Sequence, residues 1–311
     1  MYDTFNFTLP HTFFDYDHIR HIFDTKLAFK VDKRYLNGSA IVANYENYAF
    51  SLSKKHLRAN GSLTKLYYGN NVQNLNYTQI QDALMQFETL FEIPFDDAIV
   101  SRIDVATSIN LSNPVNMYLD LLVAPSGYKA SNLKNETKRY EKGNDTLNFY
   151  NKVADMRIKD TLSYKIYKAD FILKYERRCT KNLLDIIDTS DLKFKNFYTS
   201  EVYKNLIEYW YNGYQSVLKL TNPQPTQLKY NSLTDFKQSL INEGIKSLNG
   251  VEVLSESINQ IKINKKVRYR INEYLYSLPK LAPLSPILQR ELDNKIQGIY
   301  NNEMAYLEEL N

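Results

Sequence analysis

The chain has 311 residues, of which 43% are hydrophobic and 24% are charged, a composition that excludes a disordered protein and suits one large or two ordinary domains. Its single cysteine, Cys179, excludes a disulfide framework and a cysteine-rich zinc site, and it fits a reducing compartment. The net charge of +4 favours a polyanionic partner only weakly. No apolar run reaches the roughly 18–20 residues that span a bilayer, so we expect a soluble, cytoplasmic protein with no membrane partner.

The first part of the chain predicts two strands and one helix. Residues 35–45 and 62–68 are strand-like, and Asn-Gly dipeptides supply turn signals for both. Between residues 76 and 92 the apolar positions recur every three or four residues, which predicts an amphipathic helix that ends before Pro94. We expect its apolar stripe to cover one face of a sheet.

Three later segments, residues 99–109, 146–152 and 171–178, alternate with a period of two, as strands with one buried face do. Residues 127–142, between the first and the second, predict a hairpin or a loop. If the three strands share a sheet, one face is apolar. The other face then gathers the side chains with chemical potential, which are Asp104, Tyr150, Lys152 and Glu176.

Beyond the third strand the alternation stops and helical spacing takes its place. Helices are predicted to begin near residue 182 and to cover residues 203–210, 233–241, 265–278 and 288–310. We therefore place a domain boundary near residue 195. It separates an α+β domain of residues 1–195 from a mainly helical domain of residues 196–311, which would serve DNA binding or oligomerisation.

The chemistry of the polar face is that of phosphate transfer. A tyrosine phenol has a pKa of roughly 10, so Tyr150 needs help to act as a nucleophile, and Lys152 lies two residues away on the same strand face. Asp104 and Glu176 offer hard oxygen ligands, which suit Mg²⁺ or Mn²⁺ beside a phosphodiester. The same alternation also describes an ordinary surface strand with ion pairs along it.

Three motifs carry a resemblance to a known family. They are Ser101-Arg-Ile-Asp-Val-Ala-Thr-Ser108, Thr146-Leu-Asn-Phe-Tyr-Asn-Lys152 and Leu173-Lys-Tyr-Glu-Arg-Arg178. In this order and spacing they resemble the replication initiators of filamentous phages, the gene II type of rolling-circle nicking protein, which are related to plasmid rolling-circle initiators. Looser similarity extends the resemblance over residues 35–195.

The resemblance implies an antiparallel, ferredoxin- or RRM-like sheet with helices on one face, and an enzyme that nicks and rejoins origin DNA. Tyr150 matches the family's nucleophile, which forms a 5′-phosphotyrosine and frees a 3′-hydroxyl primer, and Lys152 matches the lysine that follows it. Asp104 and Glu176 match acidic positions, and their oxygen chemistry makes them candidate ligands of Mg²⁺ or Mn²⁺. The implied partners are single-stranded or supercoiled origin DNA and the replication helicase and polymerase of a bacterial host.

The histidines depart from the family pattern. Many rolling-circle nickases bind their metal through two histidines that flank a hydrophobic residue on a strand, and none of the four histidines of this chain forms such a triplet. Carboxylates would then carry more of the metal binding, with His56 as a further candidate ligand.

Cationic residues at two places in the chain are candidate DNA contacts. Residues 262–270 hold five of them, and on a helix they would form a stripe that contacts phosphates, or simply a solvated helix face. The candidates on the predicted sheet are Arg102, Lys174 and Arg178, and those of the basic segment are Lys262, Lys265, Lys266, Arg268 and Arg270.

Two other functions fit the same residues. A mobilisation relaxase would use the same chemistry in conjugative transfer. A non-catalytic module that binds single-stranded nucleic acid would use its tyrosines to stack on bases, and the chain has 26 of them. A genome poor in G and C also enriches tyrosine, so the count alone does not separate these functions.

Overall fold

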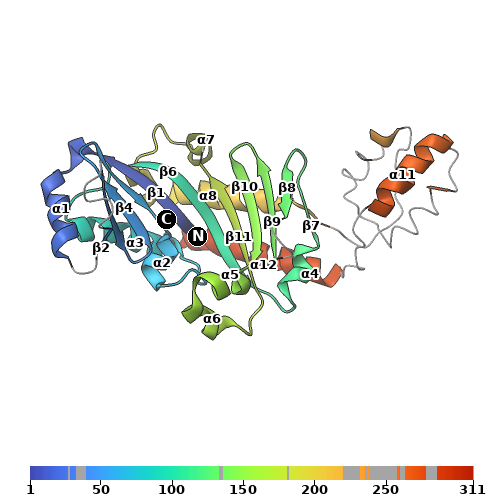
Figure 1. The fold of residues 1–311 in the computed structure, drawn as a ribbon, viewed down its shortest axis with the longest axis horizontal. Helices are drawn as coiled ribbons and strands as arrows, with labels where there is room; N and C mark the ends of the chain where they lie inside the picture. The colour runs from blue at the N-terminus through green and yellow to red at the C-terminus, as the bar shows by residue number, and fades with distance from the viewer. Residues whose placement is uncertain are drawn as a thin grey trace.

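The computed structural model of the chain is an α+β fold built on one large antiparallel sheet (Figure 1). Ten strands follow the order β2-β3-β4-β5-β1-β6-β11-β10-β9-β8, and each pair of neighbours is antiparallel. The structure describes residues 1–26, 29–32, 40–132, 136–180, 182–219, 232–234, 237, 258–259, 263–277 and 286–310.

The strands of the large sheet are β1 (Tyr2–Pro10), β2 (Phe29–Val31), β3 (Ile41–Tyr45), β4 (Tyr48–Leu52), β5 (His56–Asn60), β6 (Ile99–Asn110), β8 (Lys129–Asn132), β9 (Thr137–Lys142), β10 (Asp145–Asn151) and β11 (Ile172–Cys179). A separate pair is formed by β7 (Leu122–Val123) and β12 (Leu218–Lys219).

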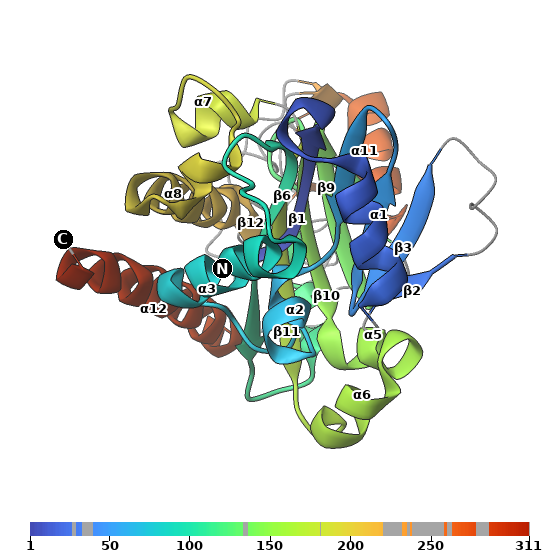
Figure 2. The ribbon, with the colours of Figure 1, turned by 90° about the vertical axis from the view of Figure 1, so that its left-hand side faces the viewer.

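Long helices cover the apolar face of this sheet. Figure 2, in which the sheet is seen nearly edge-on, shows α3 (Tyr77–Phe91), α8 (Ser200–Ser216) and α12 (Pro286–Leu310) on the same side of it. Further helices within the described residues include η1 (His11–Phe13), α1 (Tyr16–Thr25), α2 (Leu63–Tyr68), α4 (Val115–Leu119), α5 (Lys152–Lys159), α6 (Thr161–Tyr167), α7 (Leu183–Ile187), η3 (Phe194–Tyr198) and α11 (Lys265–Ser277).

Aromatic rings fill the space between the sheet and these helices. Phe7 of β1 meets Phe87 of α3 with ring centroids 5.0 Å apart. Tyr175 of β11 stacks on Phe149 of β10 at 4.4 Å, and Trp210 of α8 lies 5.2 Å from the Tyr175 ring. Such pairs add to the large apolar area that each ring buries, so this layer fixes which face of the central strands is left for polar side chains.

The sequence predictions for the central strands are confirmed. Of the predicted strands, residues 99–109, 146–151 and 172–178 lie in β6, β10 and β11, which are neighbours in the order β6-β11-β10, while Phe171 and Lys152 lie just outside them. Within residues 127–142, Lys129–Asn132 and Thr137–Lys142 pair antiparallel as β8 and β9, as the predicted hairpin requires. The helices predicted over residues 76–92 and beyond residue 182 are present as α3, α7, α8, α11 and α12. The helix predicted over residues 233–241 falls largely outside the described residues, as do residues 35–39 of the first predicted strand.

The strand predicted over residues 62–68 is wrong, because Leu63–Tyr68 form the helix α2. The Ser62 side chain accepts a hydrogen bond from the backbone N–H of Lys65, which caps the helix N-terminus, and Gly69 ends the helix with φ of 74°. Residues with a Cβ rarely adopt that left-handed conformation, which glycine tolerates. The serine cap and the glycine at the C-terminus therefore favour a helix, although the sequence between them alternates as a strand does.

The boundary predicted near residue 195 does not separate two cores. Val202, Leu206 and Trp210 of α8 and Leu292 and Ile296 of α12 belong to the same buried cluster as the central strands. The helices beyond residue 195 therefore complete the α+β core. None of the helices in the described ranges is both long and apolar enough to cross a membrane.

Candidate functional site

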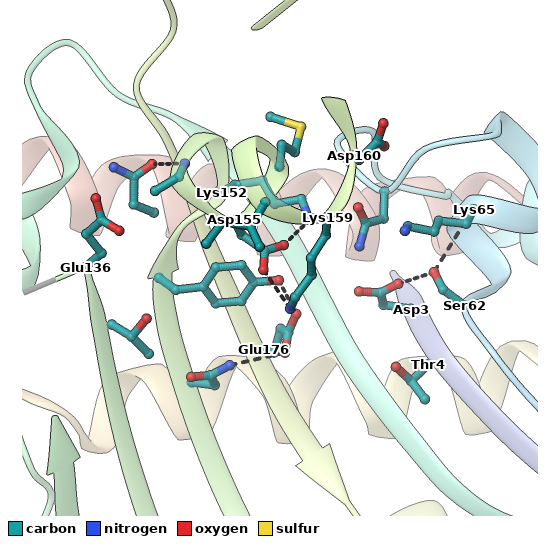
Figure 3. Close-up of a pocket in the computed structure, with 18 of the residues that line it drawn as sticks. Asp3, Thr4, Ser62, Lys65, Glu136, Lys152, Asp155, Lys159, Asp160 and Glu176 are labelled. Atoms are coloured by element: carbon teal, nitrogen blue, oxygen red, sulfur yellow. Dashed lines mark hydrogen bonds and ion pairs between the residues drawn. The ribbon is translucent and has the colours of Figure 1, made fainter. Parts of the chain in front are cut away.

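The polar face of the central strands forms the floor of a cleft of about 560 Å³ (Figure 3). Residues of β1, β10 and β11 line it together with residues of α2 and α5. Its charged lining is balanced, with five acidic and five basic side chains: Asp3, Glu136, Asp155, Asp160 and Glu176 against Lys65, Arg139, Lys152, Lys159 and Arg178.

Tyr150 and Glu176 meet in this cleft, as the alternation of their strands predicts. Asn148 of β10 is the direct register partner of Glu176 of β11, and Tyr150 lies two residues further along the same face. The Tyr150 hydroxyl donates a hydrogen bond of 2.6 Å to Glu176 Oε1, while Asn148 Nδ2 donates one of 3.4 Å to Oε2. A phenol therefore lies beside a carboxylate that can take its proton.

Both groups of this pair hold their protons more tightly than they would in water. Burial raises the pKa of Glu176, and the negative charge of Asp3 raises it further. Burial, followed by the charge of Glu176, raises the pKa of Tyr150 well above 10. A phenolate at this position therefore needs both a base within hydrogen-bonding distance and added positive charge.

Asp3 is a cleft residue that the sequence analysis missed. Tyr2 pairs with Val105 and Phe5 with Ile103, so three steps along β1 oppose two along β6, which is a β-bulge. The bulge places both Asp3 and Thr4 between two core-facing aromatic residues, and both line the cleft. The spacing of buried aromatics at positions 2, 5 and 7 was the available signal, but the extra residue breaks the period of two.

The Asp3 carboxylate is held from two sides. It accepts a hydrogen bond from the Ser62 hydroxyl, and its Oδ2 lies 3.7 Å from the ammonium of Lys174. The Lys174 side chain is only 1% exposed and also donates to the carbonyl of Asn71. Lys174 therefore fixes Asp3 from beneath, and it is too enclosed to make the DNA contact that the sequence analysis predicted for it.

Lys152 lies beside Tyr150, but it begins a helix where a continued strand was predicted. The Asn151 side chain caps α5 by accepting from the N–H of Ala154. The Lys152 ammonium lies 5.8 Å from the centre of the Tyr150 ring and donates at 3.0 Å to Asp155. Burial lowers the pKa of Lys152, although the charge of Asp155 opposes this.

Asp104, the other predicted metal ligand, does not line the cleft. Its side chain is 3% exposed and accepts from Arg102 Nε at 2.9 Å and from Arg178 Nε at 3.4 Å. Because arginines take both carboxylate oxygens, Asp104 positions Arg102 and Arg178, and of these two only Arg178 reaches the cleft wall.

Of the predicted pair of metal ligands only Glu176 lines the cleft, where Asp3 is the acidic neighbour that Asp104 was expected to be. Nowhere in the described ranges are three or more His, Cys, Asp or Glu side chains grouped to hold a metal ion. Glu176 and Asp3 nevertheless supply hard oxygens, and the buried Oδ1 of Asn148 has no hydrogen-bond partner. His56 pairs with Pro10, seven residues along β1 from Asp3, which is roughly 20 Å away at the spacing of a strand.

The basic segment forms a helix away from the cleft lining. Lys265, Lys266 and Arg270 of α11 are exposed, Arg268 is half-buried, and Lys262 lies outside the described residues. DNA contact by this cationic helix face stays a prediction. It would lie outside the cleft, because the residues that line the cleft all lie between positions 3 and 178.

Comparisons with known proteins add no family to this description. No protein-family model matches the sequence, and a search of curated proteins finds no match.

Proposed function

We propose that the protein is a rolling-circle replication initiator that nicks and rejoins origin DNA, with Tyr150 as its nucleophile. The observation that carries this proposal is the 2.6 Å hydrogen bond from the Tyr150 hydroxyl to Glu176 at the floor of an open polar cleft. The order of the three motifs supports it. In this proposal the partners are single-stranded or supercoiled origin DNA and the host helicase and polymerase in the bacterial cytoplasm.

In this proposal each of three cleft residues has a separate role in the reaction. Glu176 takes the phenolic proton as the Tyr150 oxygen attacks phosphorus, the bond from phosphorus to the 3′-oxygen breaks, and that oxygen gains a proton from solvent. The products are a 5′-phosphotyrosine and a free 3′-hydroxyl, and the phosphotyrosine retains a reactive ester bond, so the strand can be rejoined. The Lys152 ammonium beside the ring favours the charge that develops on the phenol.

Asp3, Glu176 and Asn148 would hold the divalent cation, Mg²⁺ or Mn²⁺. When bound, it would polarise a phosphoryl oxygen. Its charge would also change the balance of the lining, in which five acidic side chains match five basic ones, to a net positive value that attracts the DNA backbone.

The test is covalent adduct formation on supercoiled DNA that carries the cognate origin, with Mg²⁺ or Mn²⁺ present. We expect a protein–DNA adduct that survives denaturation with the wild type and with Tyr164→Phe, a control on α6. We expect none with Tyr150→Phe and a strongly reduced yield with Glu176→Gln. An undiminished adduct with Tyr150→Phe would place the nucleophile elsewhere, and tight binding without nicking would favour a binding module.

A mobilisation relaxase would use the same residues in the same roles. Nicking of a transfer origin but not of a replication origin would identify that function.

A further inference from the structure

The helix pair α5–α6 exposes an apolar surface next to the cleft. Ile158 of α5 is 73% exposed, and Leu162 and Ile166, which are four residues apart on α6, are each 74% exposed. Figures 1 and 2 both show α5 and α6 projecting beyond one end of the sheet. We call these three side chains the apolar ridge.

The apolar ridge is not a core face that lacks its partner. On another side of the same helix pair, Val153 and Met156 are buried in a separate small cluster with Val72 and Ile172. The helix pair is thus already anchored to the end of the sheet through its own apolar contacts. Three large aliphatic side chains left in water beside that anchored face indicate a contact with something outside the chain.

Charges around the apolar ridge are mainly positive. Three basic side chains of the two helices and Lys168, which follows α6, are exposed. Of the acidic side chains there, Asp155 and Asp160 are half-buried and only Asp170, beyond Lys168, is exposed. Asp155 pairs with Lys152 and Lys159, and Asp160 caps the N-terminus of α6. The exposed basic side chains are Arg157, Lys159, Lys165 and Lys168.

We propose that the apolar ridge binds unpaired bases of the DNA strand next to the phosphate that Tyr150 attacks. This rests on the proposed function. Ile158 of the ridge and the neighbouring Lys159 also line the cleft. A DNA strand that leaves the cleft there would pass directly onto the ridge. Apolar side chains there take the place of the neighbouring base in the stack, and the flanking cations contact phosphates. Apolar contact beside cations also suits a protein or an anionic membrane, but the continuity of the ridge with the cleft through Ile158 favours the DNA strand that the cleft would hold.

Equilibrium binding of a fluorescent single-stranded oligonucleotide of mixed sequence tests the proposal. The triple variant Ile158→Ser, Leu162→Ser, Ile166→Ser should bind about tenfold more weakly or worse, with an unchanged dependence of affinity on salt. The double variant Arg157→Gln, Lys165→Gln should instead reduce the slope of log affinity against log salt by about 0.7 for each lost phosphate contact. A duplex probe without unpaired bases should not distinguish the triple variant from the wild type.

The matched control removes three exposed apolar side chains elsewhere, Met85, Met117 and Leu184, each replaced by serine. It should bind the oligonucleotide as the wild type does. The single variant Ile166→Ser should show a smaller loss in the same direction, and it serves if the triple variant does not fold.

A folded triple or single variant that binds the oligonucleotide with unchanged affinity would overturn the proposal. So would a variant that loses binding to anionic phospholipid vesicles but keeps binding to the oligonucleotide. No measurable binding of single strands by the Tyr150→Phe parent, which serves as the wild-type reference for the ridge, would overturn it as well. Because all binding is measured in a Tyr150→Phe background, failure of the nicking chemistry is recorded separately, in the adduct assay.

Discussion

At the scale of single residues, Glu176 combines its proposed role as proton acceptor with a cost in stability. Its pKa is raised by burial and by Asp3, so the folded state binds this proton more tightly than the unfolded chain does. Stability from this group is therefore complete at acidic pH and is lost as the pH rises through the raised pKa. We expect Glu176→Gln to raise the midpoint of thermal unfolding at neutral pH in the absence of metal, and to slow adduct formation by about 10²–10⁴-fold.

The pH dependence of the rate follows from the same group. Only the ionised carboxylate can accept the phenolic proton, so at subsaturating Mn²⁺, where burial still raises the pKa of Glu176, the rate should fall on acidification at a higher pH than an ordinary glutamate would give. Thermal unfolding monitored by circular dichroism and single-turnover adduct formation across pH check the two halves. A less stable Glu176→Gln protein, or one with full activity, would contradict this account.

A second prediction at this scale separates the two aspartates. Asp3 lies in the cleft, and Asp104 lies between two arginines outside it. We expect Asp3→Asn to raise the Mn²⁺ concentration needed for half-maximal nicking by about tenfold or more, because one charged oxygen ligand is lost. Asp104→Asn should leave that concentration unchanged, even if it lowers the maximal rate by releasing Arg178. A metal requirement that shifts only with Asp104→Asn would restore the ligand pair proposed from the sequence.

At the scale of elements, one partly buried network connects α8 to β10 and β11. Asp145 at the start of β10 accepts hydrogen bonds from the Tyr128 hydroxyl at 2.6 Å, from the Tyr209 hydroxyl at 2.8 Å and from Arg177. The guanidinium of Arg177 also lies 3.5 Å from the centre of the Tyr209 ring. The network links β10 and β11 to α8, which lies on the face opposite the cleft.

We expect Asp145→Ala to lower the free energy of unfolding by about 3 kcal/mol, because a buried guanidinium loses its partner. Burial would raise the pKa of Asp145, but Arg177 and the two tyrosines hold it below the ordinary value. The difference from wild type should therefore be complete above the ordinary carboxyl pKa of roughly 4 and should shrink as the pH falls through the depressed value. Urea unfolding at several pH values measures it. The control Glu141→Ala, in an exposed pair with Arg139, should cost less than about 1 kcal/mol.

The elements also explain what could be predicted from the sequence. Period-two alternation located β6, β10 and β11 and brought Tyr150 and Glu176 to one face, because side-chain direction in a strand follows from position alone. It could not locate Asp3, because a bulge depends on pairing with a strand about 100 residues away. It also could not show that Asp104 is unavailable as a metal ligand. Arg102 and Arg178 occupy both of its carboxylate oxygens, and side-chain rotamers, not strand register, determine that contact.

At the scale of the whole molecule, the layer that supports the cleft is completed from the far end of the chain. α8 lies under β6 and β11, and α12 lies against α8 and α4. Glu291 of α12 accepts hydrogen bonds from the backbone N–H and the hydroxyl of Ser112 and from the Tyr118 hydroxyl. Burial would raise the pKa of Glu291, but these hydrogen bonds, together with one from Lys295, lower it to about 2. The strands that line the cleft and the C-terminal helices thus share one core.

This shared core predicts a single cooperative unfolding transition. Trp210 is the only tryptophan in the chain, and its side chain is fully buried between α8 and the sheet, so its fluorescence reports the separation of the two layers. Far-ultraviolet circular dichroism reports the loss of all helices and strands. If the layers form one unit, both signals should give the same urea midpoint and the same slope. A fragment of residues 1–195 should aggregate, because it would expose the faces of Phe149 and Tyr175. A fluorescence transition at distinctly lower urea than the dichroism transition, together with a soluble and folded 1–195 fragment, would instead make the C-terminal helices a domain of their own.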